Sequence, residues 1–221
     1  MTDHPLISAM MIIKYPSIEH LHRTIEGFLD QTYPNKELII INNPRSQFEA
    51  SSVTIPKYDN VHLYDTPSQF TAGQCRNYGI SKTNGQILAQ YDLDSWHHKN
   101  RLEYQVSSLV ENSAHMSILT RTLLFSGING RLSYYSNNKN LMLNSMVFIR
   151  PANIDYPDVE KQEELGLLNK FRIAKYNIIS IDKPDMVCKL YHGNIKEIKT
   201  CCTYKKHAKA VSKMLKNIDR L

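Results

Sequence analysis

The chain has 221 residues, of which 42% are hydrophobic and 22% charged, with 8 Gly and 9 Pro. Such a composition is typical of one globular domain and excludes disordered, collagen-like and low-complexity chains. The formal net charge is +6. Eight basic and two acidic residues between positions 196 and 221 account for all of that charge, so the rest of the chain is neutral. We therefore expect no nucleic-acid partner.

The chain also lacks the usual marks of a membrane or secreted protein. No stretch reaches the roughly 18 apolar residues that span a bilayer, and residues 1–5 lack the basic start of a signal peptide. The four cysteines, at 75, 188, 201 and 202, form no CxxC pair. Neither a zinc site nor a disulfide framework is indicated. We expect a cytoplasmic protein, soluble or peripherally attached to a membrane.

The first half of the sequence alternates strands with helices. Apolar runs predict strands at 6–13, 37–41, 61–64 and 86–91. Helical spacing of apolar residues predicts a helix at 17–31. A second helix, at 71–82, is predicted by Thr71 and Gln74, which have the spacing of a capping box. This order predicts parallel strands covered on both faces.

The second half is richer in strands. A helix is predicted at 99–111, followed by strands at 117–120, 123–125 and 143–149, with a polar loop at 135–140. A helix at 160–175 and strands at 177–181 and 186–191 follow. Apolar residues at 204, 208, 211, 215 and 218 predict an amphipathic C-terminal helix with lysines on its other face. That helix either packs on the main domain or contacts an anionic membrane.

The sequence Asp92-Leu93-Asp94 directly follows a predicted buried strand. In open α/β sheets, ligands bind outside the carboxyl ends of the strands. Two carboxylates at such an end suit Mg²⁺ or Mn²⁺ carrying a diphosphate. The alternative is a solvated loop whose aspartate caps the next helix.

Several segments together resemble the family-2 glycosyltransferases of GT-A fold. They are Gln31-Thr32-Tyr33-Pro34-Asn35, Arg76-Asn77-Tyr78-Gly79, Asp92-Leu93-Asp94-Ser95-Trp96 and Asn100-Arg101-Leu102. The resemblance implies a mostly parallel, Rossmann-like α/β sheet flanked by helices. It implies one domain over 1–203, with a nucleotide-binding half at about 1–96 and a smaller, strand-rich acceptor half at about 97–203. The basic helix, 204–221, would follow.

The same resemblance implies inverting sugar transfer from a nucleotide-sugar donor to a glycan, lipid-linked or protein acceptor, with Mn²⁺ or Mg²⁺. Asp94 would bind the metal, and Asp92 would contact the ribose or donor sugar. Arg76 and Asn77 would lie beside the nucleotide. His192, after the last strand, corresponds to a late histidine that helps to hold the metal or diphosphate.

The acidic pair Glu163-Glu164 precedes an apolar helix and resembles the acidic pair of this family. Glu164 is then the candidate base, with Glu163 as the alternative. Inversion requires a carboxylate that takes the proton of the attacking hydroxyl. A glutamate in a first helical turn is also favoured by the helix dipole alone.

One departure concerns the nucleobase. The family usually has paired aspartates after the second strand, whereas this chain has Asn42-Asn43. Asn43 remains a candidate donor-binding residue, because an amide can pair with a base edge. The departure keeps open a second hypothesis, a catalytically reduced nucleotide- or sugar-binding protein.

Overall fold

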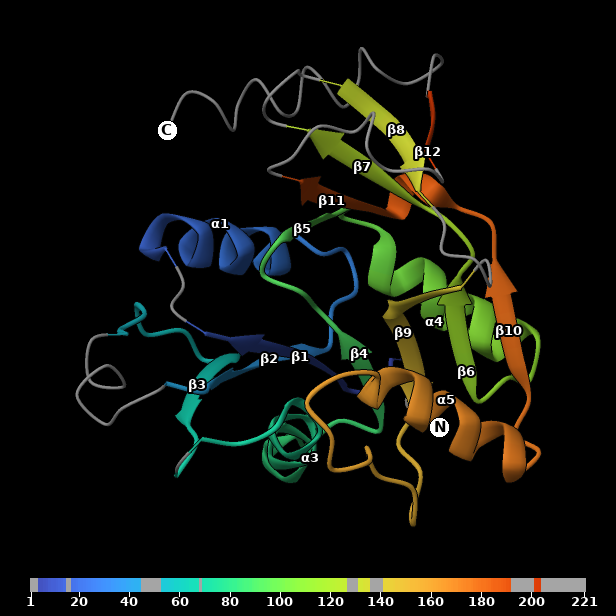
Figure 1. Ribbon diagram of the computed structural model, residues 1–221, viewed down its shortest axis with the longest axis horizontal. Coiled ribbons are helices and arrows are strands. Elements are labelled where there is room, and N and C mark those ends of the chain that lie inside the picture. The colour runs from blue at the N-terminus through green and yellow to red at the C-terminus, as the bar shows by residue number, and fades with distance from the viewer. Residues whose placement is uncertain are drawn as a thin grey trace.

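The computed structural model describes residues 4–14, 17–44, 53–67, 69–126, 131–135, 141–191 and 201–203. Within these ranges the strands form a seven-stranded sheet and a five-stranded sheet (Figure 1). The predicted polar loop lies mostly outside the described residues, and the predicted C-terminal helix lies entirely outside them.

The larger sheet has the order β10-β6-β9-β4-β1-β2-β3. Its strands are β1 (Ile7–Ile13), β2 (Lys36–Asn42), β3 (Val61–Asp65), β4 (Ile87–Gln90), β6 (Met116–Leu119), β9 (Met142–Ile149) and β10 (Ile178–Ile181). Strands β3, β2, β1 and β4 are parallel, as are β6 and β10, whereas β9 runs antiparallel to both of its neighbours. The mostly parallel α/β sheet expected from the sequence is confirmed.

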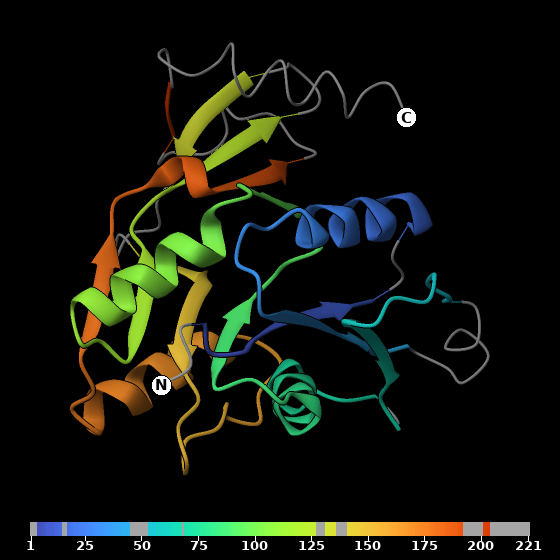
Figure 2. The same cartoon turned by 180° about the vertical axis from the view of Figure 1, so that it is seen from behind.

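Two helices cover each face of this sheet. The helices are α1 (Ile18–Leu29), α3 (Ala72–Lys82), α4 (Arg101–Glu111) and α5 (Glu163–Ile173). One core cluster joins α1 and α4 to β1, and others join α5 to β6 and α3 to β2. Figure 2 shows the same arrangement from behind, with α1 and α4 on one side and α3 and α5 on the other. Because both faces are covered, β1 and β2 are almost continuously buried.

The smaller sheet has the order β12-β8-β7-β11-β5. Its strands are β5 (Ser95–His97), β7 (Thr122–Ser126), β8 (Arg131–Tyr135), β11 (Val187–Tyr191) and β12 (Cys201–Thr203). A short 3₁₀ turn, Pro184–Met186, leads into β11. Buried Leu119, Met142 and Val187 pack the two sheets together. Strand β5 directly follows the Asp92-Leu93-Asp94 segment and therefore connects that segment to the smaller sheet.

The predicted start of α3 is confirmed in detail. The hydroxyl of Thr71 accepts from the backbone N–H of Gln74 at 3.2 Å, and Gln74 Oε1 accepts from the Thr71 N–H at 3.0 Å. These bonds satisfy two donors that the helix itself leaves free. Strands β5, β8 and β12 were not predicted from the sequence. None of the described helices is long and apolar enough to cross a membrane.

Gly73 permits the contact between α3 and the segment before α5. A Cβ atom built there lies 1.8 Å from the carbonyl oxygen of Pro157. We expect Gly73→Ala to lower the free energy of unfolding by about 3 kcal/mol, since the backbone of that segment must move. Gly27→Ala is the matched helical control, because its Cβ meets only Tyr91 Oη, at 3.9 Å. Denaturant unfolding of both variants checks this; equal stabilities would contradict the close packing.

Candidate active site

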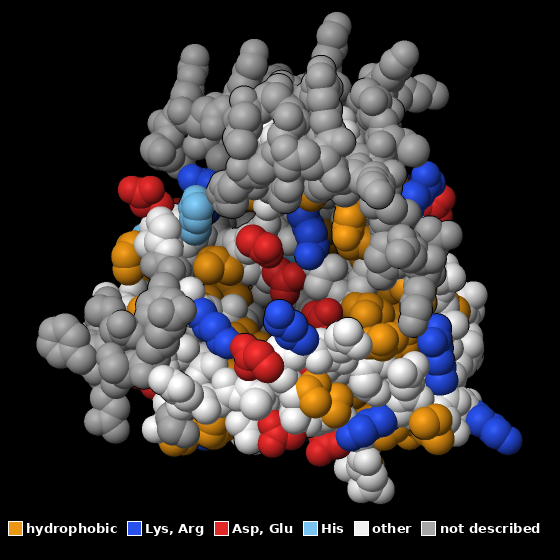
Figure 3. Space-filling view, in the orientation of Figure 1, with side chains coloured by type: hydrophobic (Ala, Val, Ile, Leu, Met, Phe, Trp, Pro, Cys, Tyr) orange, Lys and Arg blue, Asp and Glu red, His pale blue; other side chains and the backbone are white. Residues whose placement is uncertain are grey.

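A hollow lies where the predicted site residues converge. The Asp92-Leu93-Asp94 segment leaves the carboxyl end of β4, α3 contributes Arg76, and the first turn of α5 contributes two glutamates. Figure 3 shows acidic and basic side chains gathered in the middle of this face. The arrangement follows from the fold, because the carboxyl ends of parallel strands meet at one edge of the sheet.

Asp92 is held by its surroundings. Its Oδ2 atom accepts from Asn144 Nδ2 at 2.8 Å, and its Oδ1 atom lies 3.9 Å from Arg76 Nη2. Its backbone carbonyl lies 3.4 Å from His97 Nε2. The side chain is 20% exposed, so this carboxylate still reaches the hollow.

Asp94 is much freer than Asp92. Its side chain is exposed, with Ser95 Oγ at 3.4 Å from its Oδ1, while its backbone carbonyl accepts from the Leu190 N–H at 2.9 Å. Surrounding protein displaces enough water to raise the pKa of Asp94, and the nearby charge of Asp92 raises it further. A carboxylate whose negative charge is poorly stabilised by the protein is suited to bind a divalent cation, which supplies the missing positive charge.

Arg76 joins the two acidic segments. Its side chain is 7% exposed, and its Nη2 atom lies 3.3 Å from Glu164 Oε1, while its Nε atom lies 3.8 Å from Glu163 Oε1. Among the described residues, the Nε and Nη1 atoms of Arg76 have no hydrogen-bond partner. Burial alone lowers the pKa of Arg76, but Tyr156 and the surrounding carboxylates raise it above its usual value. The guanidinium therefore stays charged beside three carboxylates.

Glu164 has the most altered acidity of the glutamates here. Burial raises its pKa to about 7, an effect that Arg76 opposes and that Asp92 and Glu163 strengthen. A carboxyl group with this pKa is well matched to proton transfer near neutral pH. The side chain of Glu163 is more buried than that of Glu164, and it lies farther from Arg76, at 3.8 Å against 3.3 Å.

A buried network behind Asp92 was not foreseen from the sequence. Arg101 is fully buried and donates to His97 Nδ1 at 2.8 Å, to the Gln90 carbonyl at 2.8 Å and to the Ser145 carbonyl at 3.3 Å. Burial and Arg101 lower the pKa of His97 well below 6.5. A neutral His97 that accepts at Nδ1 carries its proton on Nε2, which faces the Asp92 carbonyl. Arg101 thus supports the Asp92 backbone without touching it.

The predicted donor-binding asparagines are occupied by backbone contacts. Asn43 Nδ2 donates to the Phe70 carbonyl at 2.9 Å, and its Oδ1 accepts from the Phe70 N–H and from Thr66 Oγ1. Asn77 Nδ2 donates to the Tyr156 carbonyl, and Asn77 Oδ1 accepts from the Tyr156 N–H, both at 2.9 Å. These amides therefore hold the backbone at Phe70 and at Tyr156.

A cavity of about 440 Å³ opens beside Asn43. It is lined by Lys14, Asn43, Pro44, Gln69, Phe70, Thr71 and Glu160. Lys14 Nζ and Glu160 Oε1 are 3.0 Å apart at its rim. The volume falls in the range of about 300–1,000 Å³ that is typical of ligand sites.

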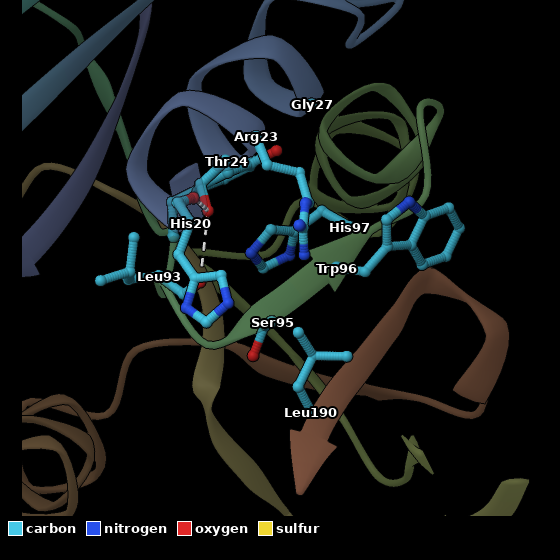
Figure 4. Close-up of a pocket in the computed structure, with 10 residues that line it drawn as sticks. His20, Arg23, Thr24, Gly27, Leu93, Ser95, Trp96, His97 and Leu190 are labelled. Atoms are coloured by element: carbon cyan, nitrogen blue, oxygen red, sulfur yellow. Dashed lines mark hydrogen bonds between the residues drawn. The ribbon is translucent and has the colours of Figure 1, made fainter. Parts of the chain in front are cut away.

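A second, small cavity lies behind the Asp92-Leu93-Asp94 segment. Figure 4 shows Arg23 of α1 above Leu93 and Ser95, with the ring of His20 beside Leu93. The hydroxyl of Thr24 donates to the Leu93 carbonyl at 3.2 Å. The cavity holds only about 40 Å³, which is enough for a water molecule or two and too little for a nucleotide.

The described residues supply few ligands for a metal. Within them, no three His, Cys, Asp or Glu side chains come together as a complete cation site. Mg²⁺ and Mn²⁺ nevertheless often bind through one or two carboxylates and the phosphates of a substrate, so Asp94 and Asp92 fit such an ion. The other predicted ligand, His192, lies outside the described residues.

Comparison with known proteins identifies the family. Residues 11–173 match the model of glycosyl transferase family 2. The chain belongs to this family. An uncharacterized glycosyltransferase of Haemophilus influenzae is 31% identical over 110 residues, which are 49% of this chain and 44% of that relative. The chain thus spans less than half the length of that curated relative.

Two solved structures share the fold of this family-2 chain. S. aureus TarS in complex with UDP has a TM-score of 0.63 at 12% identity, covering 84% of this chain and 60% of the other. The mannosyltransferase PcManGT of Pyrobaculum calidifontis, in complex with GDP-Man and Mn²⁺, has a TM-score of 0.60 at 16% identity. The match covers 86% of this chain and 57% of the other. The GT-A fold expected from the sequence is confirmed.

Proposed function

We propose that this chain transfers a sugar, with inversion, from a nucleotide-sugar donor to an acceptor hydroxyl. Asp94 would hold the metal, Asp92 would contact the ribose or donor sugar, and Glu164 is the base. The acceptor is a glycan, a lipid-linked sugar or a protein. The family match and the nucleotide-bound neighbours support the class of reaction.

One observation carries the assignment of roles. Arg76 Nη2 lies 3.9 Å from Asp92 Oδ1 and 3.3 Å from Glu164 Oε1, so a single guanidinium ties the donor-side carboxylate to the candidate base. These two acids lie far apart in the sequence, at positions 92 and 164. Holding the donor and the base in one fixed arrangement favours transfer, because the reacting groups are already oriented.

The chemical step follows from these positions. The acceptor oxygen attacks the anomeric carbon of the sugar while the bond from that carbon to the β-phosphate oxygen breaks. Glu164 takes the proton of the acceptor hydroxyl, and the nucleoside diphosphate leaves from the opposite face, so the configuration inverts. Asp92, held by Asn144 at 2.8 Å, orients the donor. When bound, a divalent metal neutralises charge on the departing diphosphate.

We assign the nucleoside end of the donor to the cavity beside Asn43, because its volume of about 440 Å³ is large enough for a nucleoside. Among the described residues, four carboxylates lie at the hollow, Asp92, Asp94, Glu163 and Glu164, against two cations, Arg76 and Lys189. This excess of negative charge repels a free diphosphate, so donor binding should depend on the metal.

A thermal-shift comparison tests the proposal. UDP-sugars and GDP-sugars are added with Mn²⁺ or with EDTA. A ligand present at about 100 times its Kd stabilises by about 2.7 kcal/mol, roughly 5 °C or more for a chain of this size. We expect such a rise with one donor class, and only with Mn²⁺. No rise with any nucleotide sugar would contradict the proposal, and a metal-independent rise would remove the role of Asp94.

A further inference from the structure

Lys189 is held beside the metal-side carboxylate by the pairing of two strands. It lies on β11 directly opposite Ser95 of β5. The next residue on β11, Leu190, donates its N–H to the backbone carbonyl of Asp94 at 2.9 Å. The strand pairing therefore fixes the backbone of Lys189 next to that of Asp94.

The positive charge of Lys189 lies near the hollow and is not paired with a carboxylate of the described residues. Its side chain is half-buried, and among the described residues it forms no ion pair. Its neighbours on β11, Cys188 and Leu190, pack in the apolar cluster of the smaller sheet. The side chain of Lys189 therefore points to the opposite face of the strand, the face from which Val187 packs against the larger sheet. The positive charge of Lys189 also opposes the rise in the pKa of Glu164. A half-buried ammonium that keeps no carboxylate partner is available to an anionic ligand.

The neighbouring cations are engaged elsewhere. Arg76 lies within 4 Å of three carboxylates, and Lys14 pairs with Glu160 at 3.0 Å. Arg101 is fully buried under Asp92. Lys189 is therefore the described cation at the hollow that is best placed to meet a phosphate.

The order of the strands indicates which phosphate of the donor Lys189 would contact. The cavity assigned to the nucleoside lies at the ends of β1 and β2, and Asp92 and Asp94 follow β4, the next strand along. The chain then enters β5, which pairs with β11. If the nucleoside occupies that cavity, the phosphates of the donor would pass Asp94, and the last of them would meet Lys189. The phosphate at that end is the one bonded to the sugar.

We propose that Lys189 binds the β-phosphate of the donor and of the nucleoside diphosphate that leaves. The inference rests on the proposed function. An ammonium is a compact point charge on a flexible stem, so it can follow the phosphate as the bond to the sugar lengthens. Its interaction with the phosphate strengthens as negative charge develops on the leaving oxygen.

Binding of mono- and diphosphates to Lys189→Met tests the inference. Calorimetry with Mn²⁺ compares UDP with UMP and GDP with GMP. Loss of a charged hydrogen bond should weaken diphosphate binding about tenfold. Monophosphate binding should change less than about twofold, because the contact lies on the second phosphate. Lys189→Arg should restore most of the diphosphate affinity, since it keeps the charge.

Lys183→Met is the matched control. Lys183 precedes the same strand, is exposed, and places its Nζ 5.6 Å from the ring centre of Tyr104. This control loses one positive charge from the same region and should bind diphosphates normally. Equal diphosphate binding by wild type and Lys189→Met would overturn the inference, as would equal losses for mono- and diphosphates. If the wild type binds no diphosphate at all, the proposed function fails first.

Discussion

Asp94→Ala is expected to abolish metal-dependent nucleotide binding while the protein stays folded. The carboxylate is exposed, and its one described side-chain contact is with Ser95 Oγ at 3.4 Å. Its removal therefore costs the fold little, and its raised pKa shows that the charged form is not stabilised there. A lost metal interaction of several kcal/mol predicts a fall in affinity of roughly 10²-fold or more with Mn²⁺ present.

Calorimetric titration of Asp94→Ala with UDP and GDP measures this loss. Asp59→Ala serves as the control, because Asp59 is also exposed and precedes β3 at the far edge of the larger sheet. Both variants should melt close to the wild type. Unchanged, Mn²⁺-dependent affinity in Asp94→Ala would move the metal site elsewhere.

Glu164→Gln is expected to lower sugar transfer by roughly 10²-fold or more, since the amide keeps the shape but cannot take a proton. Donor binding should be nearly unchanged. Glu163→Gln is the matched variant, because Glu163 is the neighbouring glutamate on the same guanidinium. If Glu163→Gln shows the larger loss, the base is Glu163.

The raised pKa of Glu164 adds two expectations about pH. A base with a pKa of about 7 is half ionised at that pH, so the transfer rate of the wild type should fall as the pH drops through 7. Ionisation is also less favourable in the folded chain than in the unfolded one. Because of this group, the free energy of unfolding of the wild type should fall as the pH rises from about 4.5 to 7. Glu164→Gln should be the more stable protein at pH 8, by on the order of 3 kcal/mol, and about equally stable at pH 4.

The sequence predicted the main body of the fold because its signals are local. The apolar runs at β1 and β2 are long, and the capping box at Thr71 fixes the start of α3. The segment Asp92-Leu93-Asp94 was predicted to follow a buried strand, and it follows β4. The roles of Asp92, Asp94, Arg76 and Glu164 came from family resemblance, and they stay predictions.

The contacts around Asp92 could not be predicted, because they join distant positions. Asn144 lies in β9 among apolar residues, where nothing in the sequence sets it apart. Arg101 is a single basic residue in the first turn of an amphipathic helix, a position that is usually solvated. Its complete burial depends on His97, Gln90 and Ser145, which come together only when the two sheets pack.

The occupied amides of Asn43 and Asn77 have a similar explanation. A side-chain amide can pair with a base edge or with a backbone. The choice depends on whether a loop lies within reach, and here Phe70 and Tyr156 do. The sequence alone could not show that these loops approach, since the residues are 27 and 79 positions from their partners.

Release of nucleoside diphosphate from a nucleotide sugar tests the central claim most directly. The wild-type chain is incubated with UDP- and GDP-sugars in Mn²⁺ or EDTA, with water or a sugar as acceptor, and the diphosphate is quantified. We predict release that needs Mn²⁺ and is lost in both Asp94→Ala and Glu164→Gln. Release that is equal in EDTA, or equal in the two variants and the wild type, would contradict a metal-dependent transferase built on these carboxylates.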